Sequence, residues 1–113
     1  MPDRRRILVA LRRCWSSQTS SKWSPSRPAA GQCSVTALVV HDRFGGRLLK
    51  TRLPDGWHFY NELDGVVHDF TAEQFETPVE YEHEPATRSE ALRDTTQSQY
   101  ACLRAAFAFE WER

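Results

Sequence analysis

The sequence predicts a single α+β domain that spans residues 1–113, with a central helix packed on a small antiparallel β-meander. Apolar residues recur at helical spacing near both ends of the chain and form an almost unbroken run in residues 33–44. Three segments with strand character lie between these helices, separated only by short turns. A chain of 113 residues is long enough for one compact domain and too short for two ordinary ones.

The first helix is expected from Asp3 to Trp15. Its apolar residues lie three and four positions apart, and its arginines occupy the other side. Cys14 falls on the apolar side and is expected in the core. Residues 16–32 follow without periodicity and contain six serines and two prolines. This long connection is either a lid or binding loop, or a flexible surface loop.

The second helix is expected from Cys33 to Phe44, ending at Gly45 and Gly46, which suit the left-handed turn that closes a helix. It is apolar on nearly every side, so we expect other elements to cover it on several sides. A last helix is expected from about Thr96 to Trp111. Its apolar stripe consists of Tyr100, Leu103, Phe107 and Trp111, with Cys102 beside it.

The strands are expected at residues 47–53, 57–63 and 66–70. If Asp64-Gly65 forms a two-residue turn, Leu63 pairs with Val66, and one face of the hairpin carries His58, Tyr60, Glu62, Val67, Asp69 and Thr71. A three-residue turn would shift the register by one and separate His58 from Asp69. We prefer the first register because it segregates polar from apolar side chains better. His58 and Asp69 are then diagonal neighbours, within reach of each other.

Two shorter features follow the strands. Residues 71–74 have the form of a capping box, which predicts a short helical turn that ends near Pro78. The acidic residues 80–84 fit either an edge strand or a loop.

The charge pattern is polarised, although the formal net charge is zero. Residues 1–30 carry seven Lys or Arg against one Asp, and residues 55–90 carry ten Asp or Glu against one Arg. The basic residues are not interleaved with aromatic ones, so we expect no nucleic-acid partner. No apolar stretch approaches the ~20 residues that span a bilayer, and we expect no membrane partner and a cytoplasmic location. The oligomeric state stays open.

Three cysteines without a CxxC pair indicate neither a disulfide framework nor a zinc site. The four histidines lack ligand spacing, and His41 and His68 are expected at the surface or hydrogen-bonded. We therefore expect no metal and no cofactor.

The position of Cys33 suggests a different chemistry. A cysteine at a helix N-terminus feels the positive end of the backbone dipoles, which favours the thiolate. Cys33 would be a nucleophile, His58 its proton acceptor and donor, and Asp69 the group that orients the ring. Gln32 is a candidate second donor to an oxyanion. The sequence thus favours a thiol-dependent hydrolase or acyl transferase that acts on an amide or ester of a small molecule or peptide.

Three other interpretations remain open. In the first, the three residues have structural roles only: Cys33 is a small buried residue, His58 a hydrogen-bonded strand histidine and Asp69 a turn residue. A second is a non-catalytic domain that binds a small molecule or peptide, with Trp23, Trp57, Tyr60 and the serine-rich loop as contacts. A third is a regulatory protein whose basic N-terminal helix face docks an acidic surface.

Four blocks of sequence resemble the YunG family of small, uncharacterised bacterial proteins. They are GQCSVTALVVHDRFGG, LLKT, GWHFYN and DFTAEQF. The likeness spans about Trp15 to Phe75 and includes the final helix. The family implies no established substrate or cofactor.

A looser resemblance is to papain-like cysteine peptidases, especially the transglutaminase-like and NlpC/P60 groups. In these proteins a cysteine that starts a helix precedes a histidine on one strand and an acidic or polar residue on the next. Cys33, His58 and Asp69 follow that order, while Ser34 stands where these groups have an aromatic residue beside the cysteine. The resemblance implies a reduced papain-like core and a catalytic role for these three residues.

Overall fold

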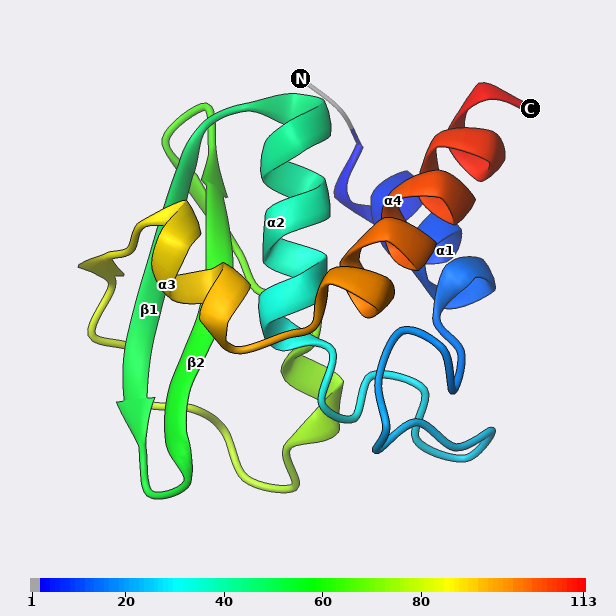
Figure 1. Cartoon of the computed structure of the whole chain (residues 1–113). Helices are drawn as coiled ribbons and strands as arrows, with labels where there is room; N and C mark the ends of the chain where they lie inside the picture. Colours follow the sequence, from blue (N-terminus) through cyan, green and yellow to red (C-terminus); the bar gives the residue numbers. More distant parts are fainter. Residues whose placement is uncertain (1–2) are drawn as a thin grey trace.

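The chain folds as an α+β domain, as the sequence predicts. A computed structural model describes residues 3–113 and contains four α-helices and four strands within them. The elements, in chain order, are α1 (Arg4–Cys14), α2 (Cys33–Phe44), β1 (Arg47–Leu53), β2 (Gly56–Leu63), β3 (Val66–His68), a 3-10 turn (Ala72–Gln74), β4 (Glu84–Pro85), α3 (Arg88–Arg93) and α4 (Gln97–Glu112). Helix α2 stands in the middle, between the sheet and the pair α1 and α4 (Figure 1).

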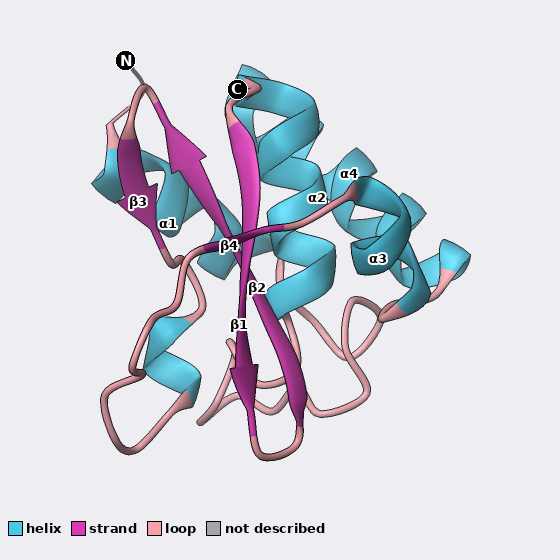
Figure 2. Ribbon diagram, turned by 90° about the vertical axis from the view of Figure 1, so that its left-hand side faces the viewer, coloured by secondary structure: helices cyan, strands magenta, loops and turns pink. Residues whose placement is uncertain are grey.

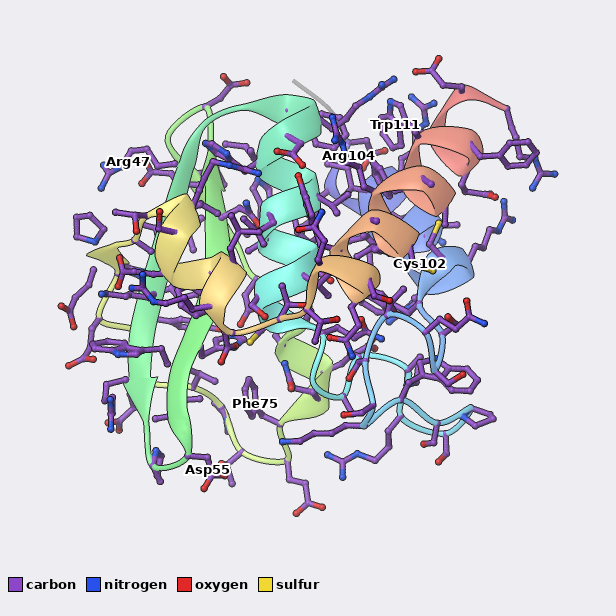
Figure 3. The ribbon with its side chains drawn as sticks, viewed as in Figure 1. Arg47, Asp55, Phe75, Cys102, Arg104 and Trp111 are labelled. Atoms are coloured by element: carbon purple, nitrogen blue, oxygen red, sulfur yellow. The ribbon has the colours of Figure 1, made fainter. Side chains whose placement is uncertain are left out.

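The sheet has the strand order β3-β2-β1-β4, and each neighbouring pair is antiparallel. Figure 2 shows that the helices gather behind one face of this sheet, while the chain that leads into β4 crosses the other. Strand β1 runs from Arg47 at one end of the molecule to the turn at Asp55 at the other (Figure 3). The Asp55 end is the one that carries the candidate site.

Helix α2 is central because almost none of its surface meets solvent. Every residue from Ser34 to Val40 is buried, including two with hydroxyl groups. One of these, Thr36, accepts a hydrogen bond of 2.9 Å from Trp15 Nε1, which satisfies a polar pair inside the core. The prediction of a helix covered on several sides is confirmed.

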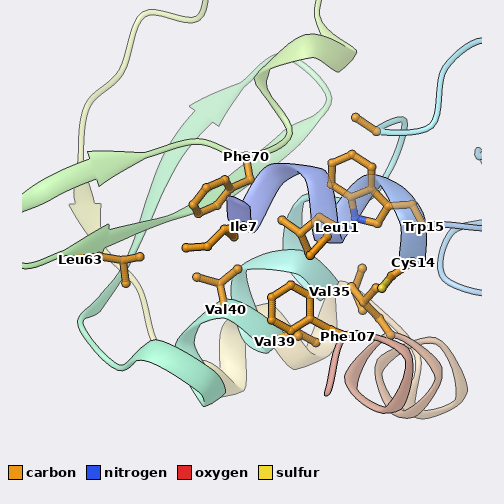
Figure 4. Packing of buried hydrophobic residues seen from close by; sticks show 13 residues of the cluster. Ile7, Leu11, Cys14, Trp15, Val35, Val39, Val40, Leu63, Phe70 and Phe107 are labelled. Atoms are coloured by element: carbon orange, nitrogen blue, oxygen red, sulfur yellow. The ribbon is translucent and has the colours of Figure 1, made fainter. Parts of the chain in front are cut away.

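Two apolar clusters hold α2 in place. The larger lies between α1, α2 and α4, and Ile7, Leu11, Val35 and Phe107 meet there (Figure 4). The smaller joins α2 to the sheet and α3 through Leu38, Leu48, Phe59 and Ala91. Cys14 is buried in the larger cluster, as expected.

The β2–β3 hairpin has the preferred register. Leu63 pairs with Val66, and Asn61 pairs with His68. Asp64 and Gly65 both have positive φ, at 51° and 78°, as a two-residue turn between twisted strands requires. The alternative register with a three-residue turn is wrong.

Two local expectations need correction, and one that was left open is resolved. Strand β3 ends at His68 and not at Phe70, because the chain turns away where the Asp69 side chain binds the backbone of Thr71. The helical turn after Thr71 covers only Ala72–Gln74 and has no capping box, since Thr71 makes no side-chain cap. The acidic stretch is mostly loop and becomes an edge strand only at Glu84–Pro85.

Helix α3 was not expected from the sequence. Thr87 and Glu90 form a complete capping box at its start, in which each side chain binds the backbone of the other. The motif was readable in the sequence, but six residues are too few to show a helical period.

The other helices lie where they were expected. Helix α1 buries Ile7, Ala10, Leu11 and Cys14, and Thr96 caps α4. Between α1 and α2 there is no helix and only an isolated bridge between Ser24 and Arg27. Among residues 3–113, no helix is long and apolar enough to cross a membrane.

Candidate active site

Cys33 is the first residue of α2 and is partly exposed. The helix can begin there because Gly31 adopts φ +69°, and a Cβ at this position would lie 2.5 Å from Ser20 Oγ. The N-cap residue Gln32 makes no side-chain cap, and the first turn contains no acidic residue. The side chains of the first turn therefore do not neutralise the positive end of the helix, and Asp94, whose carbonyl accepts from the Ser34 hydroxyl at 3.3 Å, is the acidic residue beside it.

His58 lies on β2 and is 2% exposed. Its Nε2 is 2.7 Å from Asp69 Oδ2, so the diagonal contact expected from the hairpin register forms. The edge of the Phe75 ring packs against the imidazole, with the ring centroids 4.8 Å apart. The Tyr60 ring stacks on the imidazole at 5.7 Å. The imidazole is thus clamped between aromatic rings and fixed by a carboxylate.

Asp69 receives hydrogen bonds on both oxygens. Oδ1 accepts from the backbone N–H of Thr71 at 3.2 Å and from its hydroxyl at 3.4 Å. Oδ2 accepts from His58 and from the hydroxyl of Tyr81, which is 2.6 Å away. Four donors hold this carboxylate in one orientation, which is the arrangement that lets it orient an imidazole.

The pKa values of this pair shift in opposite directions. Burial raises the pKa of Asp69, but the hydrogen bond and charge of His58 outweigh it and the net pKa is lowered. Burial lowers the pKa of His58, but the hydrogen bond to Asp69 and the contact with Cys33 raise it to about 9. At neutral pH, Asp69 is therefore ionised and accepts the Nε2 proton, and the ring carries its second proton on Nδ1.

The second ring nitrogen of His58, Nδ1, is not used in the pair with Asp69. Nδ1 is buried and has no hydrogen-bond partner among residues 3–113. The Cys33 thiol is close enough to raise the pKa of the ring, yet it does not complete a hydrogen bond to Nδ1. The geometry leaves Nδ1 as the atom that can exchange a proton with a group in the cleft.

Cys33 and His58 open into one cleft of about 840 Å³. Its walls come from the loop after α1, the β1–β2 turn and residues 74–82. Figure 3 shows Phe75 below the N-terminal end of α2, on the same side of the molecule as Asp55. Trp57 and Tyr81 also line the cleft. The volume is within the range of small-molecule sites.

The structure does not bring all the predicted contacts to this cleft. Trp57 lines it, but Trp23 packs against the core between α1, α2 and α4. The hydroxyl of Tyr60 lies 2.7 Å from Thr51 and 2.9 Å from His83, and its ring is 1% exposed. Gln32 is fully buried and its amide donates to the carbonyl of Pro28 at 3.3 Å.

Two residues of the site were not predicted from the sequence. Phe75 and Tyr81 belong to the segment between the 3-10 turn and β4, which carries no helical or strand period. Both touch the His58–Asp69 pair directly. An aromatic residue amid four acidic ones, as Tyr81 is in residues 76–84, was the available signal.

Among residues 3–113, no three His, Cys, Asp or Glu side chains form a group that could hold a metal ion. His68 contacts Arg4 at 3.2 Å, and burial followed by that charge lowers its pKa. His41 contacts Arg88 at 3.1 Å, remote from the cleft.

The family model described as YunG protein matches residues 3–112. The chain belongs to the YunG family. A relative from Bacillus subtilis (strain 168), named "Uncharacterized protein YunG", is 54% identical over 102 residues, which cover 90% of this chain and 89% of that protein. The family resemblance is confirmed and extends over nearly the whole chain. No solved structure matches the chain. The papain-like resemblance stays a prediction.

Proposed function

We propose that this YunG-family protein is a thiol-dependent hydrolase or acyl transferase that acts on an amide or ester. Cys33 would be the nucleophile, His58 the general acid and base, and Asp69 the group that orients His58. One observation carries the proposal. The His58 ring is fixed through Nε2, 2.7 Å from Asp69, while its buried Nδ1 is unpartnered in the cleft that also contains Cys33.

The proposed reaction begins with the Cys33 thiolate and the His58 imidazolium. The sulfur attacks the carbonyl carbon, a C–S bond forms, and the electron pair of the C=O bond moves to oxygen. When the C–O electron pair returns, the C–N or C–O bond to the leaving group breaks, and Nδ1–H of His58 protonates that group. The products of this half-reaction are a thioester on Cys33, a neutral imidazole and a free amine or alcohol.

The second half-reaction regenerates the thiol. Neutral His58 removes a proton from water, for hydrolysis, or from an acceptor amine or alcohol, for transfer. The resulting oxygen or nitrogen attacks the thioester carbonyl, and the C–S bond breaks. The thiolate and the imidazolium are restored, so no oxidant or reductant is required.

The start of α2 can stabilise the negative charge on the carbonyl oxygen. The first turn of any α-helix leaves N–H groups without intrahelical partners. Within the described part of the chain, the N–H groups of Cys33 and Ser34 make no backbone hydrogen bond outside the helix and meet no side-chain cap. Charge that develops beside Cys33 would meet these donors.

The order of the three residues also supports a papain-like interpretation. Cys33 starts a helix, His58 lies in the second strand, and Asp69 follows directly after the third. We include a reduced papain-like core in the proposal on this order and on the resemblance of the residues.

A non-catalytic binding domain is the second candidate. The size of the cleft and the presence of Trp57, Phe75 and Tyr81 on its walls favour it. In that case a ligand would occupy the cleft, and the Cys33 thiol would have no unusual reactivity.

Alkylation with iodoacetamide at pH values from 5.5 to 9 separates the two candidates. Mass spectrometry of tryptic peptides follows Cys33 and Cys102 in the same sample, and Cys102 serves as a partly exposed reference thiol. We expect Cys33 to react substantially near pH 6, where ordinary thiols react little because they are protonated. Coincident pH profiles for the two cysteines would contradict the proposal.

A matched pair of variants tests His58. His58→Gln should move the reaction of Cys33 to about pH 8 and above, because the positive partner of the thiolate is lost. His41→Gln, near the other end of α2, should leave the profile unchanged. An unchanged profile in His58→Gln would remove His58 from the proposed pair.

A further inference from the structure

The walls of the cleft carry more acidic than basic side chains. Four carboxylates line it, from Asp55, Glu80, Glu82 and Asp94, against two basic side chains, which is an excess of two negative charges. Within residues 3–113, none of these four carboxylates forms an ion pair, whereas seven of the other eleven acidic residues do. Their charge is available to a ligand.

The two basic residues do not neutralise this excess. Arg52 lies over Trp57, with its guanidinium carbon 5.4 Å from the ring centroid, and its backbone N–H donates to Glu82 at 3.0 Å. Lys22 acts on Asp94 only at a distance, where its charge opposes the increase in the pKa of Asp94 that burial causes. The proposed thiolate of Cys33 and imidazolium of His58 cancel each other.

Aromatic rings on the same walls favour positive charge as well. The ring of Trp57 is already occupied by two cations, since Lys50 Nζ is 4.4 Å from its centroid and the Arg52 guanidinium carbon 5.4 Å. Phe75 and Tyr81 also line the cleft and are the aromatic residues left for a ligand. Carboxylates combined with aromatic faces are the usual surroundings of a bound ammonium or guanidinium group.

An independent observation shows where the ligand would meet the catalytic groups. His58, whose side chain is 2% exposed, is one of the residues that line the cleft, and its buried Nδ1 has no hydrogen-bond partner among residues 3–113. A buried ring nitrogen without a partner carries a desolvation cost that a bound polar group would relieve. The charged walls thus belong to a cleft that is also lined by a residue with an unpartnered polar atom.

We propose that the cleft selects acyl substrates that carry a positively charged group, an ammonium or a guanidinium, near the reacting carbonyl. This inference rests on the proposed function of Cys33, because it assigns the charge of the substrate for that site. The acidic walls attract the cation and disfavour an anion of the same size.

Methanethiosulfonate reagents of different charge test the inference on the native chain. The thiolate displaces sulfinate from each reagent and forms a mixed disulfide, and the reaction differs between reagents only in the group delivered. The cationic reagent carries a trimethylammonium ethyl group and the anionic one a sulfonate ethyl group, with the methyl reagent as the neutral reference. Peptide mass spectrometry gives the rate at Cys33 at pH 6, and each rate is divided by that of a small free thiol.

We expect the corrected rate with the cationic reagent to exceed that with the anionic reagent on the order of tenfold at low salt. The figure follows from two charges that act across roughly 8 Å at a dielectric constant near that of water. At about 1 M salt the ratio should fall to within about twofold, because the screening length is then only about 3 Å.

A double variant and its matched control locate the charge. Asp55→Asn with Glu80→Gln removes the two excess charges and should bring the ratio close to that of the free thiol. Asp64→Asn with Glu84→Gln removes two carboxylates that do not line the cleft and lack ion pairs, and should leave the ratio high.

The outcomes separate this inference from the proposed function. Fast reaction of Cys33 at pH 6 with a ratio like that of the free thiol would overturn the charge preference and leave the thiolate site intact. Slow reaction with all three reagents at pH 6 would overturn the proposed function. A ratio that survives loss of Asp55 and Glu80 would overturn the assignment of the charge to these walls.

Discussion

Replacing Asp69 by Asn should change how the stability of the protein depends on pH. A group whose pKa is higher in the folded state than in the unfolded state stabilises the fold fully at pH values below its unfolded pKa. That stabilisation is lost as the pH rises through its folded pKa. For His58 the loss occurs between pH 6.5 and about pH 9. Asp69 has a lowered pKa, so it stabilises the fold at pH values above its ordinary pKa of 3.8, and this stabilisation is lost as the pH falls through its folded pKa. The pair therefore stabilises the fold most between about pH 4 and 6.5.

The size of the effect follows from the pKa of His58. The difference between about 9 and 6.5, at about 1.4 kcal/mol per unit, corresponds to about 3 kcal/mol lost between pH 6.5 and pH 9. The ring is only 2% exposed, so solvent screens little of this energy. In Asp69→Asn the carboxylate charge that raises the pKa of His58 is gone, while burial still lowers the pKa of His58. The loss of stability above pH 6.5 should then largely disappear.

Urea unfolding at pH 6 and pH 9, followed by tryptophan fluorescence, measures the difference. Both proteins compared carry Cys33→Ser, so that ionisation of the thiol, which the proposed function places in the same pH range, does not add to the measured difference. Because Cys33 contributes part of the rise in the pKa of His58, the protein with Asp69 should lose up to about 3 kcal/mol between the two conditions, and the protein that also carries Asp69→Asn less than about 1. An equal loss in the two proteins would refute the reasoning.

Two further substitutions test the fold that positions the site. Gly46→Ala should lower the free energy of unfolding in urea by about 3 kcal/mol or more, because its Cβ would lie 2.1 Å from the carbonyl oxygen of Glu62. Gly45→Ala is the control, since Gly45 has the same φ of +74° and no atom within 4 Å of the added Cβ, and it should lower the free energy clearly less. Equal losses in the two variants would contradict the clash. Thr87→Ala removes the capping box with Glu90 and should lower the free energy of unfolding by about 1 kcal/mol. Ser89→Ala changes a residue of the same helix that makes no cap, and it should lower the free energy little. Equal losses would argue against the cap.

Much of the fold could be predicted because its signals are local. Cys33 to Phe44 is an apolar run that ends at Gly45 and Gly46, which favour the end of a helix, and the structure has those limits. The hairpin register follows from one turn, Asp64-Gly65, since a two-residue turn leaves a single pairing. That register alone was enough to predict contact between His58 and Asp69.

The rest depends on contacts that local patterns do not encode. Tyr81 donates to Asp69 across 12 residues of chain, and nothing in the spacing of the intervening residues indicates that closure. Trp23 was expected at the cleft because it belongs to a polar loop, yet it packs on the core. Aromatic residues in loops are placed by tertiary packing, which a single sequence does not reveal.

The unpartnered Nδ1 of His58 separates a structural role from a chemical one better than the ion pair does. A buried ion pair is weak evidence for a stabilising role, because apolar residues of the same volume often serve as well. Among residues 3–113, three other buried polar atoms also lack partners, in Trp23, Gln32 and His68, so an unpartnered atom is not sufficient by itself. Of these four residues, only His58 lines the cleft, and its pKa is raised by Asp69 and by Cys33. A histidine that serves only in packing needs neither a place in the cleft wall nor a contact with Cys33. A histidine that exchanges a proton with Cys33 needs both.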